Sequence, residues 1–255
     1  MSTQAREFAG EVVRVLRAHG HQALLVGGCV RDLLLGREPA DYDVATDATP
    51  LEVVRIFPNT YAVGAQFGVV LVPIPAADPE RVTHGADEPL GTEAAVPIAK
   101  HEVIEVATFR CDVSYSDGRH PDAVRYSASA QEDVQRRDFT INGLLMDPAT
   151  GEVLDYVGGR NDLSAGIVRT IGDPERRFAE DKLRMLRAVR FAARFGYTIE
   201  SETFASIQRL APQIHQVSKE RVRDELTKML VEGHARRAFE LLDSSGLLRE
   251  VLPEI

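Results

Sequence analysis

Two aspartates one residue apart, Asp41 and Asp43, are side chains whose type and spacing could do chemistry. Residues i and i+2 of a β-strand point to the same face, so both carboxylates can converge on one spot. Carboxylates that close repel each other unless a cation lies between them, and Mg²⁺ prefers such hard oxygen ligands. The pair is compatible with a Mg²⁺ site and also with a solvated loop.

A glycine pair, Gly27 and Gly28, precedes these aspartates and lies between a short apolar stretch and a predicted helix. Free backbone N–H groups at a helix N-terminus form an anion site, and Arg31 adds a positive charge one turn later. A lone glycine pair is also compatible with a simple tight turn. The order of glycine pair, arginine and two carboxylates favours a phosphate-binding turn beside a metal site, while the dinucleotide-binding GxGxxG and Walker-type GxxxxGKS/T motifs are absent.

An acidic residue, Glu105, lies inside an apolar stretch with the pattern of a β-strand. Burying an unpaired carboxylate in a strand is costly, so Glu105 either faces solvent on one side of a sheet or joins the metal site. The residues alone leave both alternatives open.

Four arginines recur at spacings of three and four residues in the second half of the sequence. Helical geometry places Arg184, Arg187, Arg190 and Arg194 on one face, where like charges are costly unless something anionic neutralises them. A nucleotide triphosphate or an RNA backbone could do so. Asp181, near this face, could join an arginine in presenting hydrogen-bond acceptors and donors to a base. The alternative is an ordinary surface helix with an i,i+4 ion pair between Glu180 and Arg184.

Composition excludes several classes of protein. A hydrophobic content of 44% is that of a core-forming globular chain, and two distant cysteines, Cys29 and Cys111, exclude a disulfide scaffold or a cysteine-rich zinc module. No apolar run is long enough to cross a bilayer, so we expect a cytoplasmic protein without a membrane partner. The net charge of −9 argues against a nucleic-acid partner, but residues 169–194 hold twice as many basic as acidic residues and could bind a polyanion locally.

The elements that must position these residues form an α/β half followed by a helical half. In the first half the patterns predict helices over 4–19, 29–35 and 49–57 and strands over 23–26, 42–45, 66–72 and 103–109. Between the last two strands, 73–99 hold five prolines and read as a long irregular insertion. From about 131 the pattern turns helical, with helices over 178–195, 201–210, 219–231 and 235–244.

In order, these segments resemble the class II tRNA nucleotidyltransferases and bacterial poly(A) polymerases. The first motif of that family resembles LLVGGCVRDLLLGREPADYDVAT (24–46), and its central strand and flexible loop resemble IEVATFR (104–110) and YSDGRHP (115–121). Its ribose-selecting motif is similar to RRDFTINGLLMD (136–147), its base-selecting motif to EDKLRMLRAVRFAARFGY (180–197), and its neck helix to SKERVRDELTKML (218–230). The matches cover nearly the whole chain.

The resemblance implies an α+β fold. A nucleotidyltransferase head with a mixed sheet and flanking helices would occupy 1–160, followed by an all-helical, nucleotide-selecting neck over 161–255. Family members continue into a helical body and tail that grip tRNA, so we expect the sequence to be truncated before these parts.

The resemblance also implies a role for each candidate residue. Asp41 and Asp43 would hold Mg²⁺, with Glu105 as a third catalytic carboxylate. The others would bind the nucleotide: Gly27, Gly28 and Arg31 at the triphosphate, Arg137, Asp138 and Asn142 at the nucleotide and its ribose, Asp181 and Arg184 at the base edge, and Arg187 and Arg190 in support of phosphate and base.

The implied activity is the template-independent addition of C and A from CTP and ATP to the 3′ end of tRNA, with release of pyrophosphate. A poly(A) polymerase is the alternative within the family, and the neck pattern favours tRNA as the substrate. The stretch 115–121 argues against an enzyme that adds only CC. A non-catalytic RNA-binding protein would be expected to lack Asp41 or Asp43, and a phosphohydrolase would need further histidine or aspartate ligands that the sequence does not show.

Overall fold

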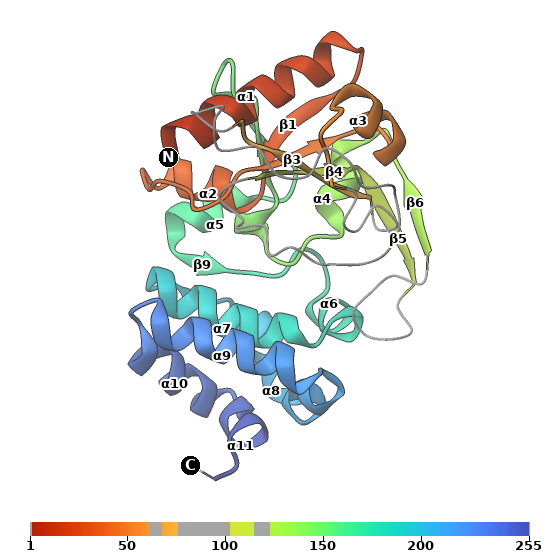
Figure 1. Cartoon of the computed structure of the whole chain (residues 1–255). Coiled ribbons are helices and arrows are strands. Elements are labelled where there is room, and N and C mark those ends of the chain that lie inside the picture. The colour runs from red at the N-terminus through yellow and green to blue at the C-terminus, as the bar shows by residue number, and fades with distance from the viewer. Residues whose placement is uncertain (1, 62–67, 76–102, 115–122, 255) are drawn as a thin grey trace, which may run out of the picture. The chain divides into compact units, whose positions relative to one another are not determined.

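The computed structural model describes residues 2–61, 68–75, 103–114 and 123–254 (Figure 1). The chain divides into two compact units, Met1–Thr108 and Phe109–Ile255. The functional boundary expected near residue 160 stays a prediction. Within the described residues, no helix combines the length and the apolar character that a membrane span requires.

The first unit is a mixed sheet with helices packed on it. Its helices are α1 (Ser2–Ala18), α2 (Gly28–Leu34) and α3 (Pro50–Ile56), and its strands are β1 (Ala23–Val26), β2 (Asp43–Thr46), β3 (Val69–Pro73) and β4 (Val103–Thr108). The strand order in this unit is β3-β4-β2-β1, in which β2 runs parallel to β4 and the other neighbours are antiparallel. The expected mixed sheet is confirmed, whereas most of the irregular insertion at 73–99 lies outside the described residues.

Local sequence explains the helices of this unit. The apolar residues of α1 recur at helical spacing, and Ala9, Val12 and Leu16 are fully buried. Helix α3 starts after Thr49, whose backbone N–H donates to the Glu52 carboxylate at 2.7 Å, with Pro50 at the first helical position. These signals are local, which is why the sequence predicted both helices.

The second unit begins with strands. It contains the antiparallel pair β5 (Arg110–Ser114) and β6 (Ala123–Tyr126), helix α4 (Ala130–Gln135), the short 3₁₀ helix η4 (Thr140–Asn142), the antiparallel pair β7 (Leu144–Met146) and β8 (Val153–Asp155), and α5 (Gly159–Ala165). Two-residue strands β9 (Ile167–Val168) and β10 (Thr198–Ile199) pair in parallel.

Helices form the rest of this unit. They are α6 (Pro174–Glu180), α7 (Leu183–Phe195), α8 (Ser201–Leu210), η5 (Ala211–Gln216), α9 (Lys219–Val231), α10 (Ala235–Ser244) and α11 (Leu247–Val251). The predicted helices over 201–210, 219–231 and 235–244 are confirmed to the residue. In Figure 1 α9 lies beside α7.

The expectation that the chain is helical from residue 131 was wrong, because β7, β8, β9 and β10 lie in that region. These strands are two or three residues long, too short to carry a two-residue hydrophobic period. A turn makes the β7–β8 pair: the Asp147 carboxylate accepts a hydrogen bond from the backbone N–H of Ala149, and Gly151 takes a φ of 73°. Turn chemistry therefore outweighed helix periodicity here.

The single helix expected over 178–195 was also wrong, because it is broken between α6 and α7. Asp181 has an extended backbone, with φ −151° and ψ 106°, and its Oδ1 accepts a hydrogen bond from the backbone N–H of Leu183 at 3.0 Å. Aspartate competes for backbone donors in this way, which ends one helix and starts the next. The break takes the Asp181 side chain out of the helical repeat.

A close backbone contact joins α5 to η4. A Cβ atom at Gly159 would lie 2.2 Å from the carbonyl oxygen of Thr140, and the Thr140 hydroxyl donates to the Asp162 carboxylate at 2.7 Å. Only glycine allows this approach, because any side chain would push the two backbones apart. The contact supports η4, the segment that carries Asn142.

We expect Gly159→Ala to lower the free energy of unfolding by about 3 kcal/mol, because the new methyl group meets backbone that cannot swing away. Urea denaturation measures the change. Gly151→Ala is the matched control, since Gly151 has a left-handed φ of 73° and nothing within 4 Å of an added Cβ. Its cost should be about 1 kcal/mol, from backbone strain alone. Equal losses at the two positions would contradict the packing argument.

Candidate active site

The predicted catalytic carboxylates lie on, or just before, two neighbouring parallel strands. Asp43 is the first residue of β2, Asp41 comes two residues before it, and Glu105 of β4 is the register partner of Asp43. Paired residues of parallel strands point to the same face, so Asp43 and Glu105 are neighbours on the sheet. Both residues are half-buried.

The buried thiol of Cys29 is affected by the charges of both aspartates. Burial, and after it the negative charges of Asp43 and Asp41, raise the pKa of Cys29 to about 12. Asp43 and Asp41 therefore both lie within electrostatic range of Cys29, the second residue of α2. The thiol stays protonated and donates to the backbone carbonyl of Val26 at 3.3 Å.

The types of side chain suit Mg²⁺, because the carboxylates of Asp41 and Asp43 offer hard oxygens and negative charge. In the described part of the chain, no three His, Cys, Asp or Glu side chains are gathered closely enough to hold a metal ion. The fit therefore rests on Asp41 and Asp43, and the role of Glu105 as a third carboxylate stays a prediction.

The glycine pair forms the start of α2 as the sequence predicted. Gly27 has a φ of 78°, a conformation that favours glycine, and Gly28 is the first residue of the helix. The Arg31 guanidinium lies over Gly28, since a Cβ atom there would be 3.6 Å from Arg31 Nη2. Arg31 is 4% exposed and donates to the Asp32 carboxylate at 2.8 Å. Asp32, which sequence reasoning missed, holds this arginine in place.

The remaining predicted residues belong to the second unit, where Asp133 anchors Arg137. The fully buried Asp133 carboxylate accepts from Arg137 Nη2 at 2.9 Å and from Arg136 Nε at 2.8 Å. Burial works against the charge of Asp133, but the two guanidinium groups hold its pKa below the ordinary value. The i,i+3 and i,i+4 spacing on and after α4 carried this signal, and sequence reasoning did not use it.

Asp138, predicted to lie near the ribose, joins three parts of the second unit. Its Oδ2 accepts from Arg187 Nε and Nη2 at 3.0 and 2.6 Å, and its Oδ1 accepts from Asn142 Nδ2 at 3.0 Å. Burial alone would raise its pKa, but the charge of Arg187 and the Asn142 hydrogen bond outweigh it and lower the pKa to about 2. Asp138 is therefore ionised, and it orients both Asn142 and Arg187.

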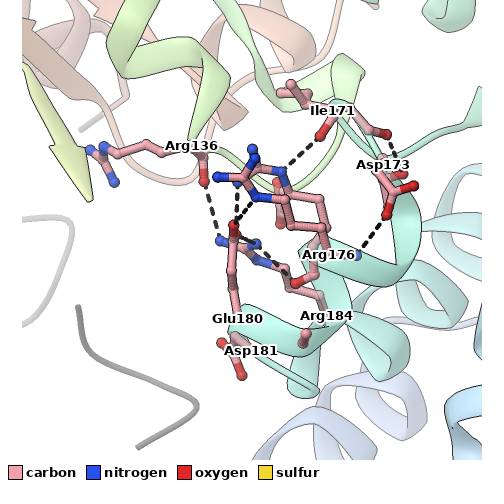
Figure 2. A network of polar contacts seen from close by, with 12 residues as sticks. Arg136, Ile171, Asp173, Arg176, Glu180, Asp181 and Arg184 are labelled. Atoms are coloured by element: carbon pink, nitrogen blue, oxygen red, sulfur yellow. Dashed lines mark hydrogen bonds and ion pairs between the residues drawn. The ribbon is translucent and has the colours of Figure 1, made fainter. Parts of the chain in front are cut away.

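The two predicted base-reading side chains have separate partners. Figure 2 shows Arg184 donating to the Glu180 carboxylate at 2.7 Å and to the backbone carbonyl of Arg136 at 3.2 Å, with Asp181 directed away from that network. The i,i+4 pair between Glu180 and Arg184 is confirmed. Asp181 instead accepts from Arg221 of α9, at 2.7 Å. Sequence reasoning missed Arg221 because 40 residues separate the partners.

The row of arginines on α7 needs no bound anion for neutrality, contrary to the sequence expectation. Carboxylates of the same unit pair with all four members: Arg184 with Glu180, Arg187 with Asp138, Arg190 with Glu225, and Arg194 with Glu232. Arg190 is 6% exposed, and its guanidinium lies 4.3 Å from the centre of the Phe191 ring. Its nucleotide-binding role stays a prediction, and the described contacts favour a role in packing α7 against α9.

Comparison with known families identifies both halves of the chain. The family model described as the poly A polymerase head domain matches residues 23–88 and 80–169. A second model, described as the probable RNA and SrmB-binding site of polymerase A, matches residues 196–255.

Individual relatives agree with these models. The CCA-adding enzyme of Geobacillus stearothermophilus is 39% identical over 236 residues, which cover 92% of this chain and 52% of the relative. That of Bacillus subtilis is 39% identical over 240 residues, covering 94% of this chain and 54% of the relative. Among solved structures, the Bacillus stearothermophilus CCA-adding enzyme in complex with CTP superposes with a TM-score of 0.77 at 38% identity, over 94% of this chain and 52% of that one.

The chain spans about half the length of these curated relatives. The head-domain model alone covers more than half of the chain, and it includes the glycine pair, both aspartates and Asp138. The chain therefore belongs to the family of the poly A polymerase head domain, which includes the class II CCA-adding enzymes.

Proposed function

We propose that the protein transfers nucleotides from CTP and ATP to the 3′ end of tRNA, adding or repairing the CCA sequence and releasing pyrophosphate. The observation that carries the proposal is the place of Asp43 at the start of β2, in register with Glu105 of the parallel strand β4 and two residues after Asp41, together with the glycine pair that begins α2. Relatives at 39% identity are named CCA-adding enzymes, and the solved relative at 38% identity is described in complex with CTP.

The residues of the first unit would handle the triphosphate and the metal. Asp41 and Asp43 would hold Mg²⁺, in keeping with a family that is normally metal-dependent. Two such ions, when bound, supply positive charge that activates the attacking 3′-hydroxyl and stabilises the departing pyrophosphate. Glu105 stands next to Asp43 in the sheet as the candidate third carboxylate. Gly27 and Gly28 present backbone N–H groups to phosphate, and Arg31, held by Asp32, adds its charge there.

The residues of the second unit would bind and choose the nucleoside. Arg137, Asp138 and Asn142 would contact the nucleotide near its ribose. Arg187 would support phosphate and base directly, and Arg190 would do so through its packing of α7 against α9. Asp181 can only accept hydrogen bonds and Arg184 can only donate them. Cytosine and adenine both present an amino donor beside a ring-nitrogen acceptor, so this pair of side chains matches both bases and opposes uracil and guanine.

We further propose that tRNA, rather than general RNA, is the substrate. The neck pattern at 218–230 and the names of the relatives favour CCA addition over poly(A) synthesis. The stretch 115–121, which argued against an enzyme that adds only CC, lies outside the described residues. The same proposal includes a head over 1–160 and a helical neck over 161–255, which also holds β9 and β10. It also includes a cytoplasmic location, where tRNA ends are repaired.

The product made on a tRNA without its CCA end separates the alternatives. With CTP alone we expect two added residues, with both CTP and ATP a complete CCA end, and with ATP alone no long tail. A long homopolymer from ATP would instead identify a poly(A) polymerase. Absence of any incorporation by the full-length protein would favour the non-catalytic RNA-binding alternative.

Replacing Asp43 by alanine should lower nucleotide incorporation by about a thousandfold or more, because it removes a ligand that is needed to hold the metal charge. Primer extension of tRNA with CTP and ATP measures the loss. The melting temperature should stay close to that of the parent, because Asp43 is half-buried at the start of a strand. Glu7→Ala, at an exposed position of α1, is the control for loss of one negative charge. Undiminished incorporation by Asp43→Ala would refute the proposed chemistry.

Replacing Asp181 by alanine should relax the preference for C and A over U and G by about 5- to 150-fold, the cost of one unpaired buried polar group. The ratio of kcat/KM for CTP to that for UTP measures the change within one preparation. Asp181→Asn should do the same while keeping an acceptor for the Leu183 N–H, because it exchanges one acceptor for a donor. A variant as selective as the parent would mean that base choice lies elsewhere.

A further inference from the structure

Both oxygens of the Asp181 carboxylate are held by other parts of the second unit. Oδ1 accepts from the backbone N–H of Leu183 at 3.0 Å, and Oδ2 accepts from Arg221 Nη2 at 2.7 Å. The side chains of Asp181 and Arg221 are 15% and 21% exposed, so their charge-assisted hydrogen bond is partly shielded from water. Asp181 is thus fixed at two atoms before any ligand binds.

Helix α9 holds Arg221 at a defined position relative to α7. Glu225, one helical turn after Arg221, accepts from Arg190 of α7 at 2.7 Å, and both members of that pair are buried. Removing one partner of a buried charge pair leaves the other uncompensated, so the two helices keep their register. The fixed register brings the Arg221 guanidinium to the break between α6 and α7, where Asp181 lies.

A carboxylate at that break needs such support. Asp181 is neither inside α6 nor inside α7, and its backbone is extended. Its partner in base reading, Arg184, is held by Glu180 and by the carbonyls of Arg177 and Arg136. Arg221 restricts the movement of the Asp181 side chain, as these acceptors restrict the movement of the Arg184 side chain. A selective hydrogen-bond acceptor must resist moving, because one that shifts can relieve the mismatch of a wrong base.

We infer that Arg221 is a positioning residue for base selection, which acts through Asp181 by fixing the direction in which this carboxylate accepts a hydrogen bond. The inference rests on the proposed function. By fixing this acceptor, Arg221 favours a base with an exocyclic amino donor, as in cytosine and adenine, over a base with a carbonyl oxygen at the same ring position, as in uracil and guanine. Arg221 itself is not assigned a contact with the nucleotide.

The test compares Arg221→Ala with Arg223→Ala in the full-length protein. Arg223 is on the same helix, two residues away, and pairs with the exposed Asp224. Both variants lose an arginine side chain from α9, but only Arg221→Ala removes the partner of Asp181. We expect the ratio of kcat/KM for CTP to that for UTP to fall about tenfold in Arg221→Ala, the cost of one charge-assisted hydrogen bond. The same ratio should stay unchanged in Arg223→Ala. The ratio compares two substrates in one preparation, so a smaller folded fraction does not alter it.

Arg221→Lys gives a second reading that does not depend on the alanine variant folding. Lysine keeps the charge but lacks the planar fork of arginine, so the ratio should fall by a smaller factor, about threefold. If the parent protein is selective and both Arg221→Ala and Arg221→Lys are as selective as the parent, the inference is overturned while the proposed function stands. A parent protein that incorporates no nucleotide at all would overturn the proposed function and this inference with it.

Discussion

The partly buried contact between Asp138 and Arg187 is the interaction on which the candidate nucleoside site depends. It joins the segment between α4 and η4 to the middle of α7, across 49 residues of sequence. Asp138 also orients Asn142, and its backbone carbonyl accepts from the N–H of Ile171 at 3.0 Å. Without this carboxylate, Arg187 would lose the acid that it is paired with, and Asn142 would lose the acceptor that fixes its amide. A pKa of about 2 keeps Asp138 charged far below neutral pH, so the contact does not titrate in the neutral range.

Charge pairing of this kind extends along α7, where each of the four arginines pairs with a carboxylate from another segment of the unit. The carboxylates that pair with one helix come from α6, from the segment before η4, and from α9 and its end. Such pairs add little to stability by themselves, since desolvation offsets much of the attraction. Their effect is on geometry. Each guanidinium that a substrate could meet is already held by partners at 2.6–3.2 Å, so binding need not order it.

Sequence reasoning found the elements that local signals define and missed those that distant partners define. Helices α8, α9 and α10 follow from hydrophobic spacing within ten to thirteen residues, and the glycine pair and Asp41–Asp43 follow from positions a few residues apart. The break at Asp181 and strands β7 to β10 depend on one capping carboxylate and on turns, which a periodic pattern hides. The pairs Asp138–Arg187, Asp181–Arg221 and Arg190–Glu225 join residues 35 to 49 positions apart, so nothing in the local sequence marks one arginine as the partner of a given acid.

The types of side chain at the base-reading position follow from what selection without a template demands. In the proposed reaction the groups around the triphosphate meet atoms that all four nucleotides share, so they cannot distinguish one base from another. Discrimination must then come from side chains whose hydrogen-bonding character does not change. Asparagine can turn its amide, serine can rotate its hydroxyl and histidine can change tautomer, and each could adapt to a wrong base. An ionised aspartate offers only acceptors and an arginine only donors, so a mismatch cannot be relieved by rearranging protons. What remains is relief by movement, and the contacts of Arg221 with Asp181 and of Glu180 with Arg184 restrict that movement.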